Sequence, residues 1–255
     1  DWFSSAIMCL LLSFHGLVFQ TKFVFSAYLQ FLFKHSILLM LKKVKEDTQM
    51  KIIIFGAGGG IGKHAVTHAL NKGYEVTAYL RNPEKLTARA ENLTVVKGEI
   101  TDYAWMKIAI SGCDAVVWCI GVNGDGAALA GHKLLIKAMK ETGVKRLVDY
   151  GTPSYHFEKD QKSMTTWFPG FFAGLAFKDS KKEIISIGED VAAFGLDWTF
   201  VRFIMPTDKE YTGSVKVTYG KDKISFSISR SDIAEFMIEQ VESDRYLREM
   251  PIIGG

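Results

Sequence analysis

Three regularly spaced glycines, Gly56, Gly59 and Gly62, constrain the fold of this chain more than any other feature. They follow the apolar run Lys51–Phe55, which predicts a buried strand, and they lead into Ile61–Asn71, which has the pattern of a helix. In such a turn the first glycine permits a tight bend and the second lets the backbone approach a pyrophosphate. The third lets the helix pack close to the strand, and the amides at the helix start attract phosphate anions. The motif predicts a dinucleotide site, and the alternative is a glycine-rich turn without a ligand.

Strands and helices alternate through Met50–Gly255. Further strands are predicted at Glu75–Leu80, Leu93–Lys97, Ala115–Ile120, Lys145–Tyr150, Trp198–Phe203 and Pro251–Ile253. Helices are predicted at Asp102–Ile110, Ala127–Glu141 and Lys181–Phe194, and a last helix, capped by Ser229 or Ser231, runs through Val241. Ser214–Tyr219 and Ile224–Ser227 suggest a hairpin. This order predicts an α/β fold, a single doubly wound (Rossmann) parallel sheet with a small C-terminal extension on the substrate side.

Residues 1–49 differ from the rest and form a separate, apolar N-terminal extension in the predicted organisation. They hold seven of the 18 phenylalanines, and Trp2–Phe19 carries no formal charge. Phe23–Leu41 is a second apolar stretch, followed by lysines typical of a cytoplasmic flank. The segment is interpreted as non-native upstream sequence, as a membrane anchor or as an extra helical layer. Residues 50–255 are then the NAD(P)-binding domain, which is expected to be cytoplasmic, or membrane-anchored if residues 1–49 are an anchor.

Charge and cysteine content exclude several classes of function. The formal net charge is only +3, from 31 basic and 28 acidic side chains, so no nucleic-acid partner is expected. The three cysteines lack metal spacing and suit a reducing compartment. His64 and His68 are four residues apart on the first predicted helix but have no evident third ligand. We therefore expect no metal site.

The end of the second strand predicts which cofactor is bound. An Asp or Glu at this point usually binds the ribose hydroxyls of NAD. Here Arg81 stands in that place, and Lys85 follows it. A guanidinium attracts a 2′-phosphate and stacks on adenine, so the sequence predicts NADP(H) rather than NAD(H). The alternative is that Arg81 is an ordinary surface residue.

Six segments of the chain resemble those of a known family. The segments KIIIFGAGGGIGKHAV, GYEVTAYLRNPEKL, LTVVKGEITD, GCDAVVWCIG, GVKRLVDYGT and GLDWTFVR resemble the atypical short-chain dehydrogenase/reductases with an NAD(P)H-binding (NmrA-like) domain. Within that group the chain is most similar to the flavin reductase/biliverdin reductase B type, as TGSVKVTYGKDKISFSISRSDIAEFMIEQV also indicates. The resemblance covers about Met50–Pro251.

The resemblance implies positions for the cofactor site. Glu99 and Ile100 lie beside adenine, Ile120, Gly121 and Val122 line the ribose and nicotinamide side, and Tyr150, Gly151 and Thr152 end near the nicotinamide. Phe203–Pro206 should cover the nicotinamide, although Phe203 stands where the family often has proline. The expected cofactor residues are therefore Gly56, Ala57, Gly58, Gly59, Gly60, Ile61, Gly62, Arg81, Lys85, Glu99, Ile100, Ile120, Gly121, Val122, Tyr150, Gly151, Thr152, Phe203 and Met205.

Catalytic residues are harder to predict. Many short-chain dehydrogenases use a Tyr-x-x-x-Lys pair, and Tyr155 with Lys159 has that spacing. This tyrosine follows the fifth strand too soon for the usual arrangement, and Pro153 disfavours a helix there. Thr152, Ser154 and Tyr155 are the catalytic candidates. The hydroxyl of Thr152 or Ser154 could bind the carboxamide or the substrate. An aromatic wall for a flat acceptor is suggested by Tyr155, Phe157, Trp167, Phe168, Phe171 and Phe172. The alternative is that these side chains pack in the core or form a subunit contact.

Three functions remain open. The first is an NADPH-dependent oxidoreductase that transfers hydride to a flat conjugated small molecule of the flavin, quinone or tetrapyrrole type. The second is a non-enzymatic NADP(H)-binding redox sensor or regulator of the NmrA-like type. The third is an epimerase or a scaffold protein on the same fold. A monomer or a homodimer is expected.

Overall fold

The computed structural model describes Lys34 and residues 49–161 and 178–255. The chain divides into two units, Asp1–Gln49 and Met50–Gly255. Within the described residues no helix is both long and apolar enough to cross a membrane. The apolar stretches Trp2–Phe19 and Phe23–Leu41 lie outside these residues apart from Lys34, so the interpretations of the N-terminal extension stay predictions.

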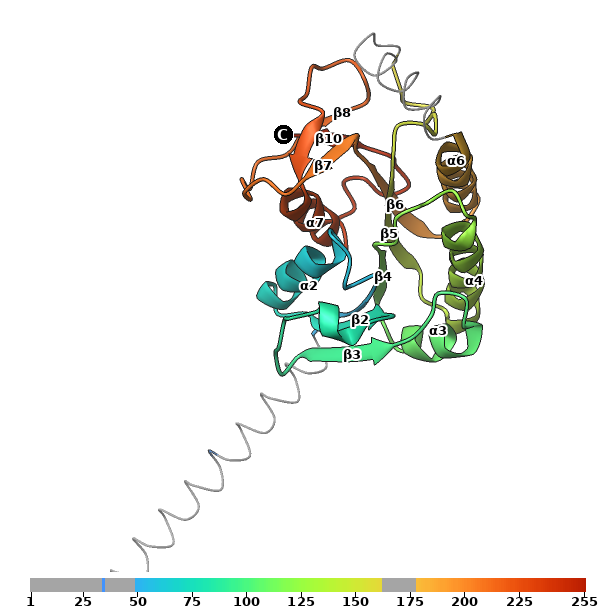
Figure 1. Ribbon diagram of the computed structural model, residues 1–255, viewed down its shortest axis with the longest axis vertical. Helices are drawn as coiled ribbons and strands as arrows, with labels where there is room; N and C mark the ends of the chain where they lie inside the picture. Colours follow the sequence, from blue (N-terminus) through green and yellow to red (C-terminus); the bar gives the residue numbers. More distant parts are fainter. Residues whose placement is uncertain (1–33, 35–48, 162–177) are drawn as a thin grey trace, which may run out of the picture. The chain divides into compact units, whose positions relative to one another are not determined.

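One mixed, mostly parallel sheet organises Met50–Gly255 (Figure 1). Its strands run in the order β3-β2-β1-β4-β5-β6-β10-β8, and only the edge strand β8 is antiparallel to its neighbour. The bounds are β1 Lys51–Phe55, β2 Glu75–Leu80, β3 Leu93–Lys97, β4 Ala115–Trp118, β5 Arg146–Gly151, β6 Asp197–Arg202, β8 Lys216–Thr218 and β10 Ile252–Gly254. The chain winds outward in both directions from β1, so a crevice is expected between the carboxyl ends of β1 and β4.

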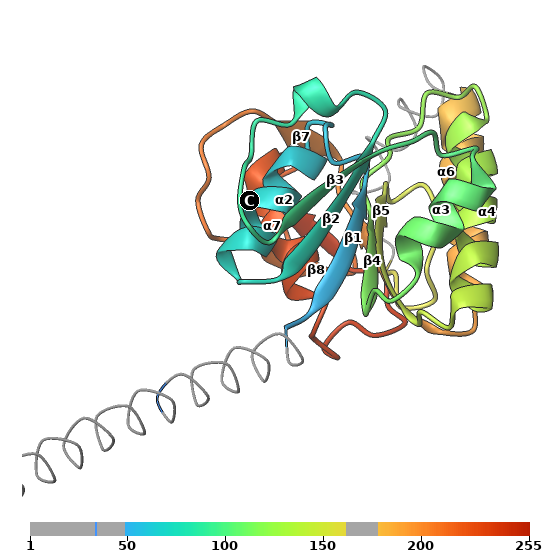
Figure 2. The ribbon, with the colours of Figure 1, turned by 90° about the horizontal axis from the view of Figure 1, so that it is seen from below.

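Helices cover both faces of this sheet (Figure 2). One face carries α2 (Gly62–Asn71) and α7 (Arg230–Glu239), which pack against each other. The other face carries α3 (Tyr103–Ile110), α4 (Ala127–Thr142) and α6 (Lys178–Ala192). This arrangement confirms the predicted doubly wound α/β fold.

The central strands are buried on both faces, which explains why they read as continuous apolar runs. In β1, Ile52 and Ile54 belong to the core under α2 and α7, whereas Ile53 and Phe55 belong to the core under the other helices. These four side chains are fully buried. Since successive side chains of a strand point to opposite faces, a single strand supplies both cores.

Side chains cap the starts of two helices, and the cap of α7 is one that the sequence predicts. Asp102 accepts a hydrogen bond from the backbone amide of Trp105 and caps α3. Ser229, rather than Ser231, caps α7 by accepting from the amide of Asp232. Such side-chain acceptors satisfy amides that have no partner inside the helix.

The fourth strand, β4, ends at Trp118, two residues earlier than expected. Cys119 and Ile120 therefore lie just beyond the carboxyl end of this strand.

The predicted hairpin between Ser214–Tyr219 and Ile224–Ser227 is wrong. Strand β8 pairs antiparallel with β10, whereas β9 (Ser227–Ser229) pairs parallel with β7 (Met205–Thr207) in a separate two-stranded sheet. Directly after β8, the Thr218 hydroxyl accepts hydrogen bonds from the amides of Gly220 and Asp222, which bends the chain away. The alternating pattern identified strand segments, but long-range partners determined their pairing.

Candidate cofactor site

The turn after β1 requires glycine for steric reasons. Gly56 has a φ of +75°, in the left-handed region, and its amide donates to the Tyr79 carbonyl at 3.0 Å. A Cβ on Gly56 would lie 2.5 Å from the carbonyl oxygen of Cys119 on β4's extension. A Cβ on Gly62 would lie 2.1 Å from the Gly56 carbonyl oxygen, so the helix start packs directly on the turn. The first and last glycines thus have the roles expected of a dinucleotide-binding turn.

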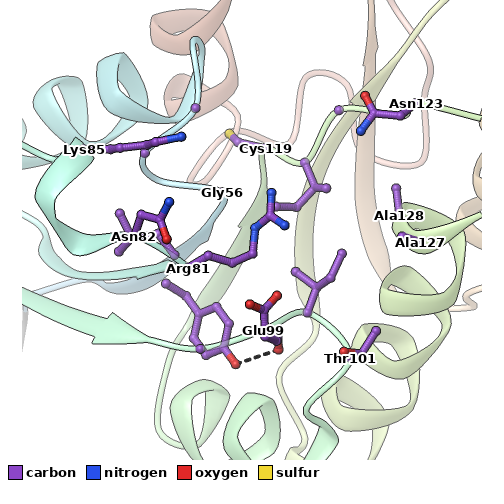
Figure 3. A pocket seen from close by; sticks show the side chains of 18 of the residues that line it. Gly56, Arg81, Asn82, Lys85, Glu99, Thr101, Cys119, Asn123, Ala127 and Ala128 are labelled. Carbon is purple, nitrogen blue, oxygen red and sulfur yellow. Dashed lines mark hydrogen bonds between the residues drawn. The ribbon is translucent and has the colours of Figure 1, made fainter. Parts of the chain in front are cut away.

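A cavity of about 350 Å³ opens beside this turn, at the carboxyl ends of β1 to β4 (Figure 3). It occupies the crevice where the strand order reverses, the usual ligand position in a doubly wound sheet. It brings together nine of the expected cofactor residues: Gly56, Gly58, Gly59, Arg81, Lys85, Glu99, Ile100, Ile120 and Gly121. Ala57 is buried beneath the turn, and Gly60, Ile61 and Gly62 continue it into α2 without lining the cavity.

Sequence reasoning missed ten residues that also line this cavity: Tyr79, Leu80, Asn82, Gly98, Thr101, Cys119, Asn123, Asp125, Ala127 and Ala128. Most of them flank a strand end, so the general rule for parallel sheets could have found them. Asn123 and Asp125 lie in the loop after β4, where no sequence pattern indicates a binding residue.

The Cys119 thiol in the wall of this cavity is protonated. Burial, and to a smaller extent the Asp149 carboxylate, raises its pKa.

Three charged side chains lie at the end of the cavity where adenine is expected. Arg81 and Lys85 are exposed and approach from β2 and η1 (Pro83–Lys85), while Glu99 follows β3. Tyr79 holds the loop that follows β3 in place, because its hydroxyl donates a hydrogen bond to the Glu99 carbonyl at 3.0 Å (Figure 3). Burial, together with Asp102 and Glu99, raises the pKa of Tyr79 to about 12, so the phenol stays a neutral donor.

A second, smaller cavity of about 50 Å³ lies toward β5, β6 and α6. It brings together five more of the expected positions, Val122, Tyr150, Gly151, Thr152 and Phe203, together with Ile120, which lines both cavities. Its remaining wall is apolar and consists of Trp118, Ile184, Ile187 and Phe200. The two cavities therefore share a boundary at the end of β4.

Tyr150 lies at this boundary. Its hydroxyl is 3.5 Å from the position that a Cβ on Gly121 would take, and its ring contacts Phe203 with 5.2 Å between centroids. Within the described part of the chain the hydroxyl has no hydrogen-bond partner. Burial, followed by Cys119 and Asp149, raises the pKa of Tyr150, so its O–H remains available as a donor.

Only one of the three predicted catalytic candidates lines a cavity. Thr152 lines the small cavity, and its hydroxyl donates to the Ser154 hydroxyl at 2.9 Å. Ser154 and Tyr155 line neither of the two cavities described. The Tyr155 ring packs against Gly188 on α6, where a Cβ would lie 2.8 Å from the ring, whereas Lys159 forms an ion pair with Glu249. A Tyr155–Lys159 acid pair has no support in this geometry.

Arg202 fixes the loop that carries these residues. Its fully buried guanidinium binds both carboxylate oxygens of Asp160 at 2.6 Å and donates to the Tyr155 carbonyl at 2.9 Å. Such a bidentate pair has a defined geometry and holds the loop at the end of β6.

The predicted aromatic wall is only partly described. Four of its residues, Trp167, Phe168, Phe171 and Phe172, lie outside the described residues, and the Phe157 ring contacts Tyr219. Met205 begins β7, is half-exposed and lines neither cavity.

The fold and the glycine turn define a Rossmann-type dinucleotide-binding protein. The chain belongs to the NAD(P)H-binding family, whose model matches residues 56–244. This result confirms the expected family relationship and the NAD(P)H cofactor class. The choice between NADP(H) and NAD(H) stays a prediction that depends on Arg81.

Relatives are found among both sequences and solved structures. Cinnamoyl-CoA reductase 1 of Petunia hybrida is 33% identical over 111 residues, 38% of this chain and 33% of the relative. Phenylcoumaran benzylic ether reductase IRL1 of Ginkgo biloba is 32% identical over 163 residues, 59% of this chain and 47% of the relative. ChuY, an anaerobillin reductase from Escherichia coli O157:H7, matches with a TM-score of 0.66 and 20% identity over 80% of this chain and 97% of ChuY.

These similarities differ in what they establish. The chain spans about a third or less of the length of the curated relatives that match first. The match to ChuY is below the identity at which activity can be compared, and it establishes the fold alone. Both kinds of match agree with an NAD(P)H-binding Rossmann domain.

Proposed function

We propose that this chain is an NADPH-dependent oxidoreductase that transfers hydride to a flat conjugated acceptor of the flavin, quinone or tetrapyrrole type. The observation that carries the proposal is the pair of adjoining cavities, one charged and one apolar, with Ile120 in both walls. A charged crevice suits a dinucleotide, and an apolar recess with two hydroxyls suits a conjugated ring system. The names of the relatives, which are reductases, support the reaction class.

The residues of the large cavity fit NADP(H). Gly56–Gly62 form a cradle that a Cβ at either end would fill, and the start of α2 presents amides to a diphosphate. Arg81 and Lys85 are the exposed cations at the adenine end, where they would bind a 2′-phosphate. Bound there, NADPH would supply the hydride. The chain itself would hold the cofactor, orient it and exclude water from the recess beyond Ile120.

The small cavity supplies the groups for the acceptor. Hydride addition to a conjugated ring places negative charge on a ring oxygen or nitrogen, which then takes a proton from solvent. The neutral Tyr150 hydroxyl, which has no described partner, would donate a hydrogen bond to that atom. Thr152 would orient the carboxamide or the acceptor from the same wall. The reaction then needs no proton relay through Tyr155 and Lys159.

One observation favours a second candidate, a non-enzymatic NADP(H) sensor. Lys159 is bound to Glu249 and Tyr155 is packed on α6, so the usual acid pair is absent from the described loop. A sensor would bind NADP(H) and distinguish its redox states without oxidising it. The third alternative, an epimerase or a scaffold protein, has no comparable support.

The deciding experiment follows NADPH absorbance with the full chain and FMN, a short-chain quinone or biliverdin in turn. Biliverdin represents the tetrapyrrole class of acceptor, and it is included because ChuY is described as an anaerobillin reductase. We expect acceptor-dependent oxidation, slowed by Arg81→Gln and unaffected by Arg245→Gln, a matched substitution of an exposed arginine outside the cavity. Tight NADPH binding without oxidation of any acceptor would favour the sensor and contradict the reductase.

A further inference from the structure

Arg230 lies against the glycine turn from an element distant in sequence. A Cβ on Gly60 would be 2.9 Å from both Cδ and Nε of Arg230, so the missing side chain of Gly60 makes room for the arginine. Arg230 is the first residue of α7, which packs beside α2 (Figure 1). A guanidinium thus borders the turn expected to hold a diphosphate, although it lines neither cavity.

The position of Arg230 is unfavourable for α7 itself. The N-terminus of a helix carries partial positive charge, so a cation in its first turn is repelled. The start of α2 adds a second positive helix end, because the two helices pack together and Gly60 leads into α2. Three positive groups therefore gather around one exposed turn. One carboxylate, Asp232 in the first turn of α7, already faces that helix end, but it is engaged in hydrogen bonds of its own.

The carboxylate that pairs with Arg230 itself is weakly held. Arg230 forms an ion pair with Asp208, with 2.8 Å between nitrogen and oxygen. The Asp208 side chain is 81% exposed. Exposed ion pairs contribute little net stability, because water screens the two charges, so a stronger anion can displace Asp208. A diphosphate offers more charge and matches the guanidinium fork.

We propose that Arg230 binds the diphosphate of NAD(P)H across Gly60, and that Asp208 holds the same guanidinium when no cofactor is bound. The first part makes α7 a contributor to the cofactor site. The second part makes Asp208 a competitor of the cofactor for one cation. The proposal depends on cofactor binding alone, and no acceptor or turnover is involved.

The two partners of this ion pair should have opposite effects on affinity. Arg230→Gln should raise the NADPH dissociation constant about tenfold or more, a loss typical of one charge-assisted contact. Asp208→Asn should leave NADPH binding as tight as in the wild type or tighter, because it removes the competing anion. Arg230→Lys should fall between, since it keeps the charge but loses the fork. Binding is measured on the full chain by quenching of tryptophan fluorescence.

Two controls separate this role from a structural one. Arg248→Gln and Asp197→Asn break another exposed ion pair, away from the turn, and should leave NADPH binding unchanged. Adenosine 2′-monophosphate lacks the diphosphate, so its affinity should fall in Arg81→Gln but not in Arg230→Gln. Thermal unfolding of each variant shows that the folded state is retained.

Two results would overturn the proposal. One is unchanged NADPH affinity in Arg230→Gln. The other is an equal loss in Arg230→Gln and Asp208→Asn, which would mean that the ion pair only stabilises the fold. If wild-type protein oxidises no acceptor but these affinities shift as expected, the reductase function fails and the role of Arg230 stands.

Discussion

The carboxylate of Glu183 on α6 accepts a hydrogen bond from the backbone amide of Leu129 on α4, with 2.9 Å between oxygen and nitrogen. Its second oxygen accepts from the amide of Gly124 at 3.0 Å. This buried carboxylate thereby caps α4 and ties down the loop that contributes Asn123 and Asp125 to the large cavity. A residue outside the cavity thus determines the shape of one of its walls.

Substitution Glu183→Ala should destabilise the fold and weaken cofactor binding together. It leaves two amides without their acceptor, which costs about 1–3 kcal/mol, measured by urea unfolding. The NADPH dissociation constant should rise because the loop after β4 loosens. Glu189→Ala on the same helix removes an exposed carboxylate and should change neither quantity. A stable Glu183→Ala variant with unchanged affinity would show that this loop does not contact the cofactor.

Alanine substitutions at two glycines distinguish the cost of a left-handed backbone from the cost of a steric clash. Gly112 has a φ of +81° and nothing within 4 Å of a Cβ, so Gly112→Ala should cost only the roughly 1–2 kcal/mol of a left-handed alanine. Gly56→Ala adds a Cβ at 2.5 Å from a backbone oxygen that cannot turn away. We expect a loss of stability at least about 1 kcal/mol larger, with NADPH binding abolished only in Gly56→Ala. Equal unfolding free energies for the two variants would contradict the packing of the turn.

Two tyrosines test which phenol serves the proposed reaction. Tyr150→Phe removes the hydroxyl at the cavity boundary and should lower kcat for a quinone or flavin about tenfold, the value of one hydrogen bond made in the transition state. NADPH binding should stay within about twofold. Tyr155→Phe should leave kcat unchanged, because its ring packs on α6. A loss of kcat in Tyr155→Phe alone would restore the tyrosine–lysine pair as the proton donor.

Much of this fold could be predicted because burial on both faces marks central strands directly. The run Lys51–Phe55 has four fully buried side chains divided between two cores, and the strand matches the prediction at both ends. The glycine turn could be predicted equally well, because the conformation of Gly56 and the close packing of Gly62 allow no other residue type at these positions. Local sequence was sufficient wherever local geometry imposed the constraint.

The rest depended on contacts between distant segments. Leu129 and Glu183 are 54 positions apart, and nothing near either residue indicates the other. Arg230 reaches Gly60 only because α7 packs beside α2. The hairpin prediction failed for the same reason, because β10 offered β8 a partner from the end of the chain. Periodicity identifies an element and its buried face, but it does not identify the partner.

The carboxylate of Asp232 gives a pH-dependent prediction. It accepts hydrogen bonds from the Ser229 hydroxyl and from the amides of Thr212 and Gly213, near the start of α7. Burial alone would raise the pKa of Asp232, but these hydrogen bonds together outweigh it and lower the pKa below the ordinary value. The folded protein therefore prefers the ionised form more than the unfolded chain does. This preference stabilises the fold above the unfolded pKa of about 4 and is lost as pH falls through the lower, folded value.

Substitution Asp232→Asn should accordingly reduce the unfolding free energy at pH 7 by about 1 kcal/mol or more. The difference from the wild type should stay constant down to about pH 5 and shrink below about pH 4, as the wild-type carboxylate becomes protonated. Urea unfolding across this pH range measures both curves. Asp222→Asn, at an exposed aspartate whose side chain has no hydrogen bond among the described residues, is the matched control and should follow the wild type throughout. A difference that is independent of pH would mean that shape, rather than charge, makes Asp232 stabilising.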